Sequence, residues 1–172
     1  GMTLHLAGRA LEFTDTPGHA KHHHCIWDAT TRGWFTGDTF GLSYPEFNTA
    51  NGPWMLPTST PVQFEPEALR QSVHRLLARQ PECMYLTHYG RVGQVERLAA
   101  DLLVTLQGMV DVGLANRHAP ARHARLREGL LALYLQSLRA HGCAFADNEC
   151  AALLEMDVEL NAQGLGVWLD RN

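Results

Sequence analysis

Short apolar runs alternate with turn residues in the first half of the chain, whereas apolar residues recur at helical spacing in the second half. Five runs bounded by glycine, proline, threonine or charged residues predict β-strands over residues 4–6, 10–14, 24–28, 33–36 and 83–87. Thr30 to Gly33 fits a hairpin turn between the third and fourth of these strands. The pattern changes near residue 90, and from there it predicts helix almost to the end.

A helix is predicted between the last two strands, over residues 66–79. Pro66 suits its first turn, apolar residues recur at helical spacing, and Pro81 prevents its continuation. A strand, a helix and a second strand in this order predict a crossover connection onto one sheet.

The second half predicts three or four helices. Apolar stripes run over residues 95–110 and 126–138, and Gly142 ends the second of them. Asp147 is a candidate N-cap for a helix over 150–160, followed by a short amphipathic tail over 161–169. We therefore expect an α/β (α+β) fold in which residues 1–92 form a sheet with its crossover helix. Residues 93–172 form a helical segment packed on it in the same structural unit.

The segment between Asp38 and Glu65 is rich in aromatic residues and prolines and shows no periodicity. Loops of this length in compact domains are often functional lids or pocket walls. A surface loop pinned by its own aromatic side chains is an equal alternative. Tyr44 and Trp54 in this segment, and Tyr89 further on, are expected either at a pocket mouth or in the core.

Composition indicates a soluble globular protein of 172 residues, since 45% are apolar and 19% charged. The net charge of −4, without a basic cluster, predicts binding neither to nucleic acid nor to a membrane surface. We see no signal peptide and no run of about 18 apolar residues, which predicts a cytoplasmic location without a membrane span. The four cysteines lie far apart and are expected to be reduced.

Three predicted strands end in segments that each carry one potential metal ligand beside a glycine. These segments are Thr16-Pro17-Gly18-His19, Thr36-Gly37-Asp38-Thr39 and Thr87-His88-Tyr89-Gly90. If the strands are neighbours in one sheet, His19, Asp38 and His88 converge at its edge. Two imidazoles and a carboxylate suit zinc, or iron or manganese where more oxygen ligands join.

These motifs, TPGH, FTGDT and THYG, resemble those of the metallo-β-lactamase-fold superfamily of metal-dependent hydrolases over roughly residues 8–92. The resemblance implies that His19, Asp38 and His88 are metal ligands and that Asp38 bridges two metals, with zinc, or iron or manganese, as the cofactor. It also implies hydrolysis of a small-molecule ester, thioester, lactone or phosphoester by metal-activated water.

The family's HxHxDH signature is absent from this chain. Side chains of the contiguous His22, His23 and His24 alternate between the two faces of a strand and do not replace it. The chain therefore resembles only the C-terminal half of the αββα sandwich: one small mixed sheet covered by helices, with a C-terminal helical segment. One metal position keeps His19 and Asp38, the other keeps Asp38 and His88, and the expected general base is missing, so we expect no activity from the chain alone.

Half of a sandwich leaves one sheet face bare, and Leu11, Phe13, Ile26 and Phe35 are candidates for it. We expect this face to pair in a homodimer or with a complementing N-terminal half. The alternative function is a catalytically inactive, truncated domain that dimerises or complements a separate half. His22 and His23, near His19, and Thr39, beside Asp38, are expected around the metal site or in ordinary hydrogen bonds.

Overall fold

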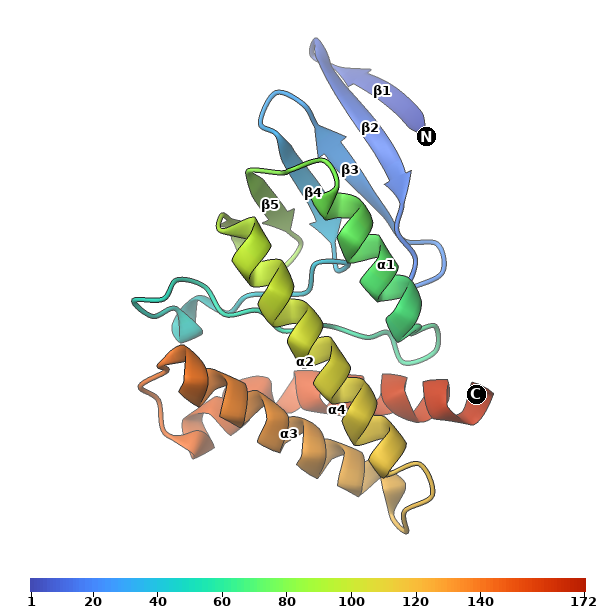
Figure 1. The fold of residues 1–172 in the computed structure, drawn as a ribbon, viewed down its shortest axis with the longest axis vertical. Helices are drawn as coiled ribbons and strands as arrows, with labels where there is room; N and C mark the ends of the chain where they lie inside the picture. Colours follow the sequence, from blue (N-terminus) through green and yellow to red (C-terminus); the bar gives the residue numbers. More distant parts are fainter.

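Six strands follow one another across a single mixed sheet in the computed structural model, which describes residues 1–172. The strands are β1 (Met2–Leu6), β2 (Arg9–Asp15), β3 (His24–Asp28), β4 (Gly33–Gly37), β5 (Cys83–Leu86) and β6 (Gly90–Val92). The helices are α1 (Pro66–Leu77), α2 (Val95–Ala115), α3 (Arg122–His141) and α4 (Asp147–Arg171), and a short 3-10 helix, η1, spans Pro45–Phe47. Figure 1 shows the sheet above a layer formed by α3 and α4, with α2 running from one to the other.

The sheet is antiparallel except for the pair β4–β5, which is parallel. Helix α1 makes the crossover between these two strands, as the strand–helix–strand order predicts, and the expected α+β class is confirmed. Strand β6 was not predicted. It has three residues and pairs with β5 through a hairpin whose turn holds Tyr89 at φ 74°.

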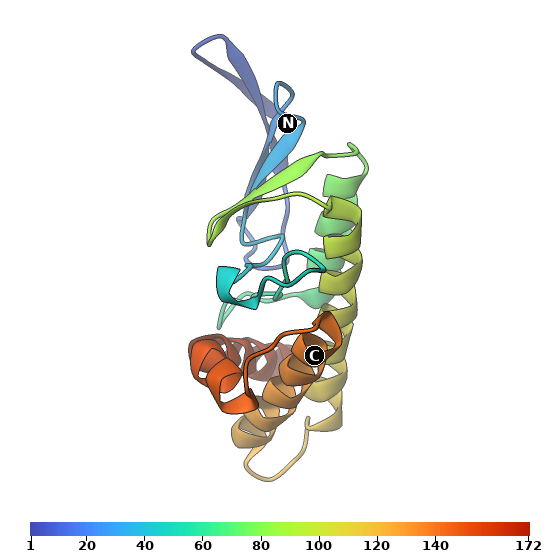
Figure 2. The same cartoon turned by 90° about the vertical axis from the view of Figure 1, so that its left-hand side faces the viewer.

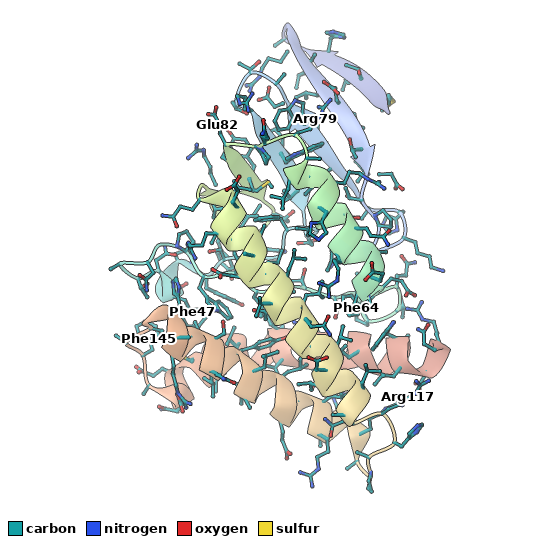
Figure 3. The ribbon with its side chains drawn as sticks, in the orientation of Figure 1. Phe47, Phe64, Arg79, Glu82, Arg117 and Phe145 are labelled. Atoms are coloured by element: carbon teal, nitrogen blue, oxygen red, sulfur yellow. The ribbon has the colours of Figure 1, made fainter.

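One face of the sheet is covered by α1 and α2. Trp27 and Trp34 lie on this face with their rings 5.1 Å apart, and Trp34 Nε1 donates a hydrogen bond to the Leu76 carbonyl of α1 at 3.0 Å. Arg79 follows α1 (Figure 3), and its guanidinium lies 5.2 Å from the Trp27 ring centre. These contacts bury the aromatic row and hold α1 against the strands.

The opposite face of the sheet carries no helix (Figure 2). The strand register places Phe13, Ile26, Phe35 and Tyr85 in one row across four strands of this face. Phe35 is 42% exposed and stacks on Tyr85 with ring centres 4.7 Å apart. Leu11 lies two residues from Phe13 on the same face. We call this the bare face; it contains the four apolar residues expected there, and it is what half of a two-sheet sandwich leaves open.

Helix α2 is apolar enough, with a mean hydropathy of 1.5, and long enough, at 21 residues, to cross a bilayer by length and composition. Its apolar residues instead serve two cores. Leu98 and Leu102 pack in the sheet core, whereas Leu106 and Met109 pack in the helical core with α3 and α4. The helix is therefore the shared wall of both layers, and its hydropathy reflects this burial.

Helix α4 is one continuous helix of 25 residues, so the predicted break between 160 and 161 is wrong. Asn161 is buried within α4. Its side-chain Oδ1 accepts a hydrogen bond from the Ser59 N–H, and its Nδ2 donates to the Pro57 carbonyl, so this polar residue does not end the helix. Asp147 is the first helical residue rather than the cap. The Ala146 N–H before it is capped by the Glu149 carboxylate at 2.8 Å, and Asp147 pairs with Arg139.

Residues 38–65 run between the sheet and the layer formed by α3 and α4 (Figure 1). Phe40, Phe47, Leu56 and Phe64 are each fully buried, and Leu42 and Leu56 pair across the segment through backbone hydrogen bonds of 2.9 and 3.0 Å. Its phenylalanines and Trp54 are core residues, whereas Tyr44 is half-buried.

Replacing Leu102 by alanine should lower the free energy of unfolding by about 2–5 kcal/mol, because its side chain is 1% exposed and leaves a cavity between the sheet and the helices. The matched control is Val104→Ala on the same helix, where the side chain is 72% exposed and the expected change is within about 0.5 kcal/mol. Urea unfolding measures both. Equal losses would contradict the placement of α2 as a core helix.

Candidate functional site

The structure brings the three predicted ligands together at the lower edge of the sheet, where β4 and β5 end. His19 Nε2 lies 3.7 Å from Asp38 Oδ2, and His88 Nε2 lies 3.4 Å from Asp38 Oδ1. The carboxylate therefore has an imidazole on each of its two oxygens. The convergence follows from topology, because the parallel strands β4 and β5 are neighbours and both point to this edge.

Two glycines allow the chain to approach this closely. Gly37 has φ 49°, and a Cβ there would lie 2.4 Å from His23 Nε2. Gly18 has φ 133°, and a Cβ there would lie 2.2 Å from the backbone nitrogen of Leu69 in α1. Both positions need a residue without a side chain.

His19 is oriented by Thr58. Its Nδ1 lies 3.1 Å from the Thr58 carbonyl oxygen, which only accepts, so Nδ1 carries the proton. In the neutral ring Nε2 is then unprotonated and faces Asp38. A ligating histidine whose other nitrogen donates to a carbonyl is typical of metal sites.

His23 supports Asp38 through the backbone. The Asp38 N–H donates to His23 Nε2 at 3.1 Å, so Nδ1 carries the proton and donates to Thr39 Oγ1 at 3.0 Å. The Thr39 hydroxyl in turn donates to Thr16 Oγ1 at 3.2 Å. Burial, followed by the charge of His19, lowers the pKa of His23, which agrees with a neutral ring.

His88 stands at the open side of the site, with its side chain 53% exposed. The next residue, Tyr89, packs its ring on Tyr44, and Tyr44 Oη donates to Asp157 Oδ2 of α4 at 2.7 Å. Burial raises the pKa of Asp157, and its interactions with Tyr44 and His88 oppose the shift. Burial and the bond to Asp157 also raise the pKa of Tyr44, which stays a neutral donor.

The donor set itself shows whether a cation suits this position. Asp38 Oδ1 is buried without a hydrogen-bond partner, since His88 Nε2 lies near it but is not aligned to donate. A buried carboxylate oxygen without a donor is costly. Two ligands of one tetrahedral zinc ion, each about 2.0–2.2 Å from it, lie about 3.4 Å apart. Both imidazole–carboxylate separations, 3.4 and 3.7 Å, are near this value.

No known family model and no curated protein sequence matches the chain. Among solved structures, a metallo-β-lactamase family protein from Thermus thermophilus aligns over 99% of this chain with a TM-score of 0.62 and 18% identity. This chain has the metallo-β-lactamase fold. It covers 47% of the length of the Thermus protein, so the fold is present in part.

Two further solved structures are similar over less of the chain. A metallo-β-lactamase superfamily protein from Sulfolobus tokodaii aligns over 81% of this chain and 49% of its own, with 23% identity and a TM-score of 0.47. A metallo-β-lactamase from Pontibacter korlensis aligns over 62% and 45%, with 16% identity and a TM-score of 0.46.

In this partial metallo-β-lactamase fold, no three histidine, cysteine, aspartate or glutamate side chains are arranged to hold one ion. Each oxygen of Asp38 has a single imidazole beside it, so the chain offers two ligands at each of two positions. Catalytic zinc sites typically have three protein ligands. Each oxygen of Asp38 thus has fewer protein ligands near it than a catalytic zinc ion typically has.

The other predicted site residues divide between the site and its surroundings. His23, Thr39, Tyr44 and Tyr89 lie in the contacts described above. His22 is exposed and takes no part in the hydrogen bonds that hold His19 and His23. Trp54 is 4% exposed in the helical core, where its Nε1 donates to Ser137 Oγ of α3 at 2.9 Å.

Two residues that contribute to the site were not identified from the sequence. Thr58 contacts His19 and also donates from Oγ1 to the Asp38 carbonyl at 3.3 Å. Asp157 reaches the site from α4, more than a hundred residues away along the chain. In the sequence, Asp157 stands among apolar residues such as Leu154 and Val158, and an acid at such a position is a signal of a polar contact in the core. A threonine within an aperiodic segment, such as Thr58, carries no such signal.

Replacing His23 by alanine should lower the free energy of unfolding by about 1–3 kcal/mol, because the Asp38 N–H and the Thr39 hydroxyl lose their partner. The control, His22→Ala, removes an exposed ring and should cost less than about 0.5 kcal/mol. Urea unfolding gives both values, and long-range ¹H–¹⁵N spectra should show His23 protonated at Nδ1. An Nδ1-unprotonated ring, or equal losses, would contradict this network.

Proposed function

We propose that this chain supplies part of the metal site of a metal-dependent hydrolase and acquires activity only when further ligands join it. One observation carries the proposal: the half-buried Asp38 carboxylate has an imidazole nitrogen beside each oxygen, and its buried Oδ1 has no hydrogen-bond donor. In the neutral His19 ring, Nε2 is unprotonated and faces Asp38 Oδ2, and a cation between the two would relieve the repulsion of their lone pairs.

Zinc, iron or manganese are the cations that suit two imidazoles and a carboxylate. A divalent cation bound there lowers the pKa of a water and polarises the scissile oxygen of an ester, thioester, lactone or phosphoester. The residues of this chain have separate tasks. Asp38 shares its two oxygens between the two positions, and His19 and His88 each supply one nitrogen. Thr58 and His23 hold the ligands in place without contacting the cation.

A second polypeptide segment that carries the other sheet of the sandwich is the partner we propose for the bare face. Two features support it: each metal position lacks ligands, and the chain spans 47% of the length of the similar Thermus protein. Phe13, Ile26, Phe35 and Tyr85 offer the apolar surface for such a segment. Burying a few hundred Å² of this surface contributes several kcal/mol, at about 25 cal/mol per Å².

Titration with Zn²⁺, followed by calorimetry, tests the proposed ligands. Asp38→Asn should abolish specific binding at both positions, since it removes the shared charge, whereas His19→Ala and His88→Ala should each weaken it at least about tenfold. His118→Ala, in the loop between α2 and α3, is the control and should leave the affinity unchanged. Wild-type affinity in Asp38→Asn would refute the metal site. Hydrolysis of a generic ester should stay at background for the chain alone and appear when the complementing segment is added.

The bare face also favours a second candidate function, a non-catalytic domain that pairs with a second copy of itself. Light scattering over a range of concentrations distinguishes the two. A self-pairing face predicts a dimer that Phe35→Lys converts to monomer, because the charge has to be desolvated in the interface. The control, Val104→Lys, changes an exposed residue of α2 and should leave the mass unchanged. A wild-type monomer that binds the complementing segment would instead favour the hydrolase.

A further inference from the structure

His19 and His88, which flank Asp38, are each held in place by contacts with other segments of the chain. His88 is 53% exposed and follows β5 in a tight turn, and Tyr89 in that turn has φ 74°, which side-chain-bearing residues rarely adopt. Such a conformation persists only where neighbouring contacts fix it. His19 lies in the loop after β2, and Thr58 of the segment 38–65 holds its ring. Both sets of contacts extend to α4.

On the His88 side, the path runs through two tyrosines. The Tyr89 ring lies on the Tyr44 ring with centres 4.7 Å apart, and Tyr44 also packs edge-on against Phe47 at 5.6 Å. Tyr44 Oη donates to Asp157 Oδ2 at 2.7 Å. Asp157 is 9% exposed on α4, so the turn that presents His88 is anchored to the helix.

On the His19 side, the path runs through the backbone on both sides of Thr58. Asn161 Oδ1 accepts from the Ser59 N–H at 2.9 Å, and its Nδ2 donates to the Pro57 carbonyl at 3.0 Å. The same Nδ2 donates to Tyr134 Oη of α3 at 2.9 Å. The Asn161 side chain therefore clamps the two residues that flank Thr58, and Asn161 is 2% exposed.

Asp157 and Asn161 are four residues apart, so they lie on one face of α4, one turn from each other. Two buried polar side chains on an otherwise apolar helix face are costly unless each is fully paired. Here the contacts of Asp157 lead to His88, and those of Asn161 lead to His19. We propose that α4 is a positioning helix for the metal centre, in which Asp157 sets the place of His88 and Asn161 sets the place of His19 on the two sides of Asp38. The effect of this positioning on metal binding rests on the proposed function, whereas the positioning itself does not depend on it.

The experiment reads the two imidazoles separately in the metal-free chain, by NMR shifts and relaxation of their Hε1–Cε1 groups. Asp157→Ala should perturb His88 and leave His19 unchanged, whereas Asn161→Ala should perturb His19 and leave His88 unchanged. Asp157→Asn keeps an oxygen that accepts from Tyr44 and should restore the wild-type His88 signal. The matched control is Ser137→Ala, which breaks the bond from Trp54 to α3 and should change neither histidine.

Zn²⁺ affinity is the second readout. Asp157→Ala and Asn161→Ala should each lower it about 10–100-fold, as expected for groups that orient ligands, while Ser137→Ala changes it less than about threefold. Where an alanine variant does not fold, Tyr44→Phe, which deletes only the hydroxyl, and Asn161→Ser replace it. If both variants perturb both histidines alike, or neither, the positioning role is refuted. If the selective pattern appears but His19→Ala and His88→Ala do not affect Zn²⁺ binding, the positioning stands and the metal function fails.

Discussion

A carboxylate held between two imidazoles, with one oxygen buried and lacking a donor, is the constraint around which the rest of this molecule is arranged. An unpaired buried polar group costs about 1–3 kcal/mol, and more when it is charged. The chain maintains this arrangement with many contacts. Gly37 lets the backbone pass under His23, the Asp38 N–H is tied to that ring, and Thr58 holds both the Asp38 carbonyl and His19. Such contacts fix Asp38 and His19 relative to each other.

The two layers of the fold have different tasks. The sheet brings His19, Asp38 and His88 to one edge, since β4 and β5 are parallel neighbours, and its bare face carries no helix. The helical layer does not supply ligands. It lies below the sheet (Figure 1), and α2 joins the two layers by packing in both cores. The segment 38–65 lies between them, and its fully buried residues include Phe40, Phe47, Leu56 and Phe64.

Local patterns predicted the first five strands, α1 and the ends of β2, β4 and β5, because alternation, helical spacing and glycine-bounded turns act over a few residues. The meeting of His19, Asp38 and His88 followed from motif resemblance and strand order. Strand β6 was missed, since three residues carry no periodicity and its pairing depends on a turn with Tyr89 at positive φ. The unbroken α4 and the burial of Trp54 depend on partners such as Ser59 and Ser137, which lie far away in the sequence. Long-range polar contacts of this kind leave no local signal, and they are the ones that tie α4 to the site.

Anomalous scattering from a crystal soaked in Zn²⁺ tests the central claim most directly. We expect density at two positions that share Asp38, one bonded to His19 Nε2 and the other to His88 Nε2 at about 2.0–2.2 Å. A single ion elsewhere on the chain, or imidazoles that turn away from Asp38 while zinc occupies other sites, would contradict it.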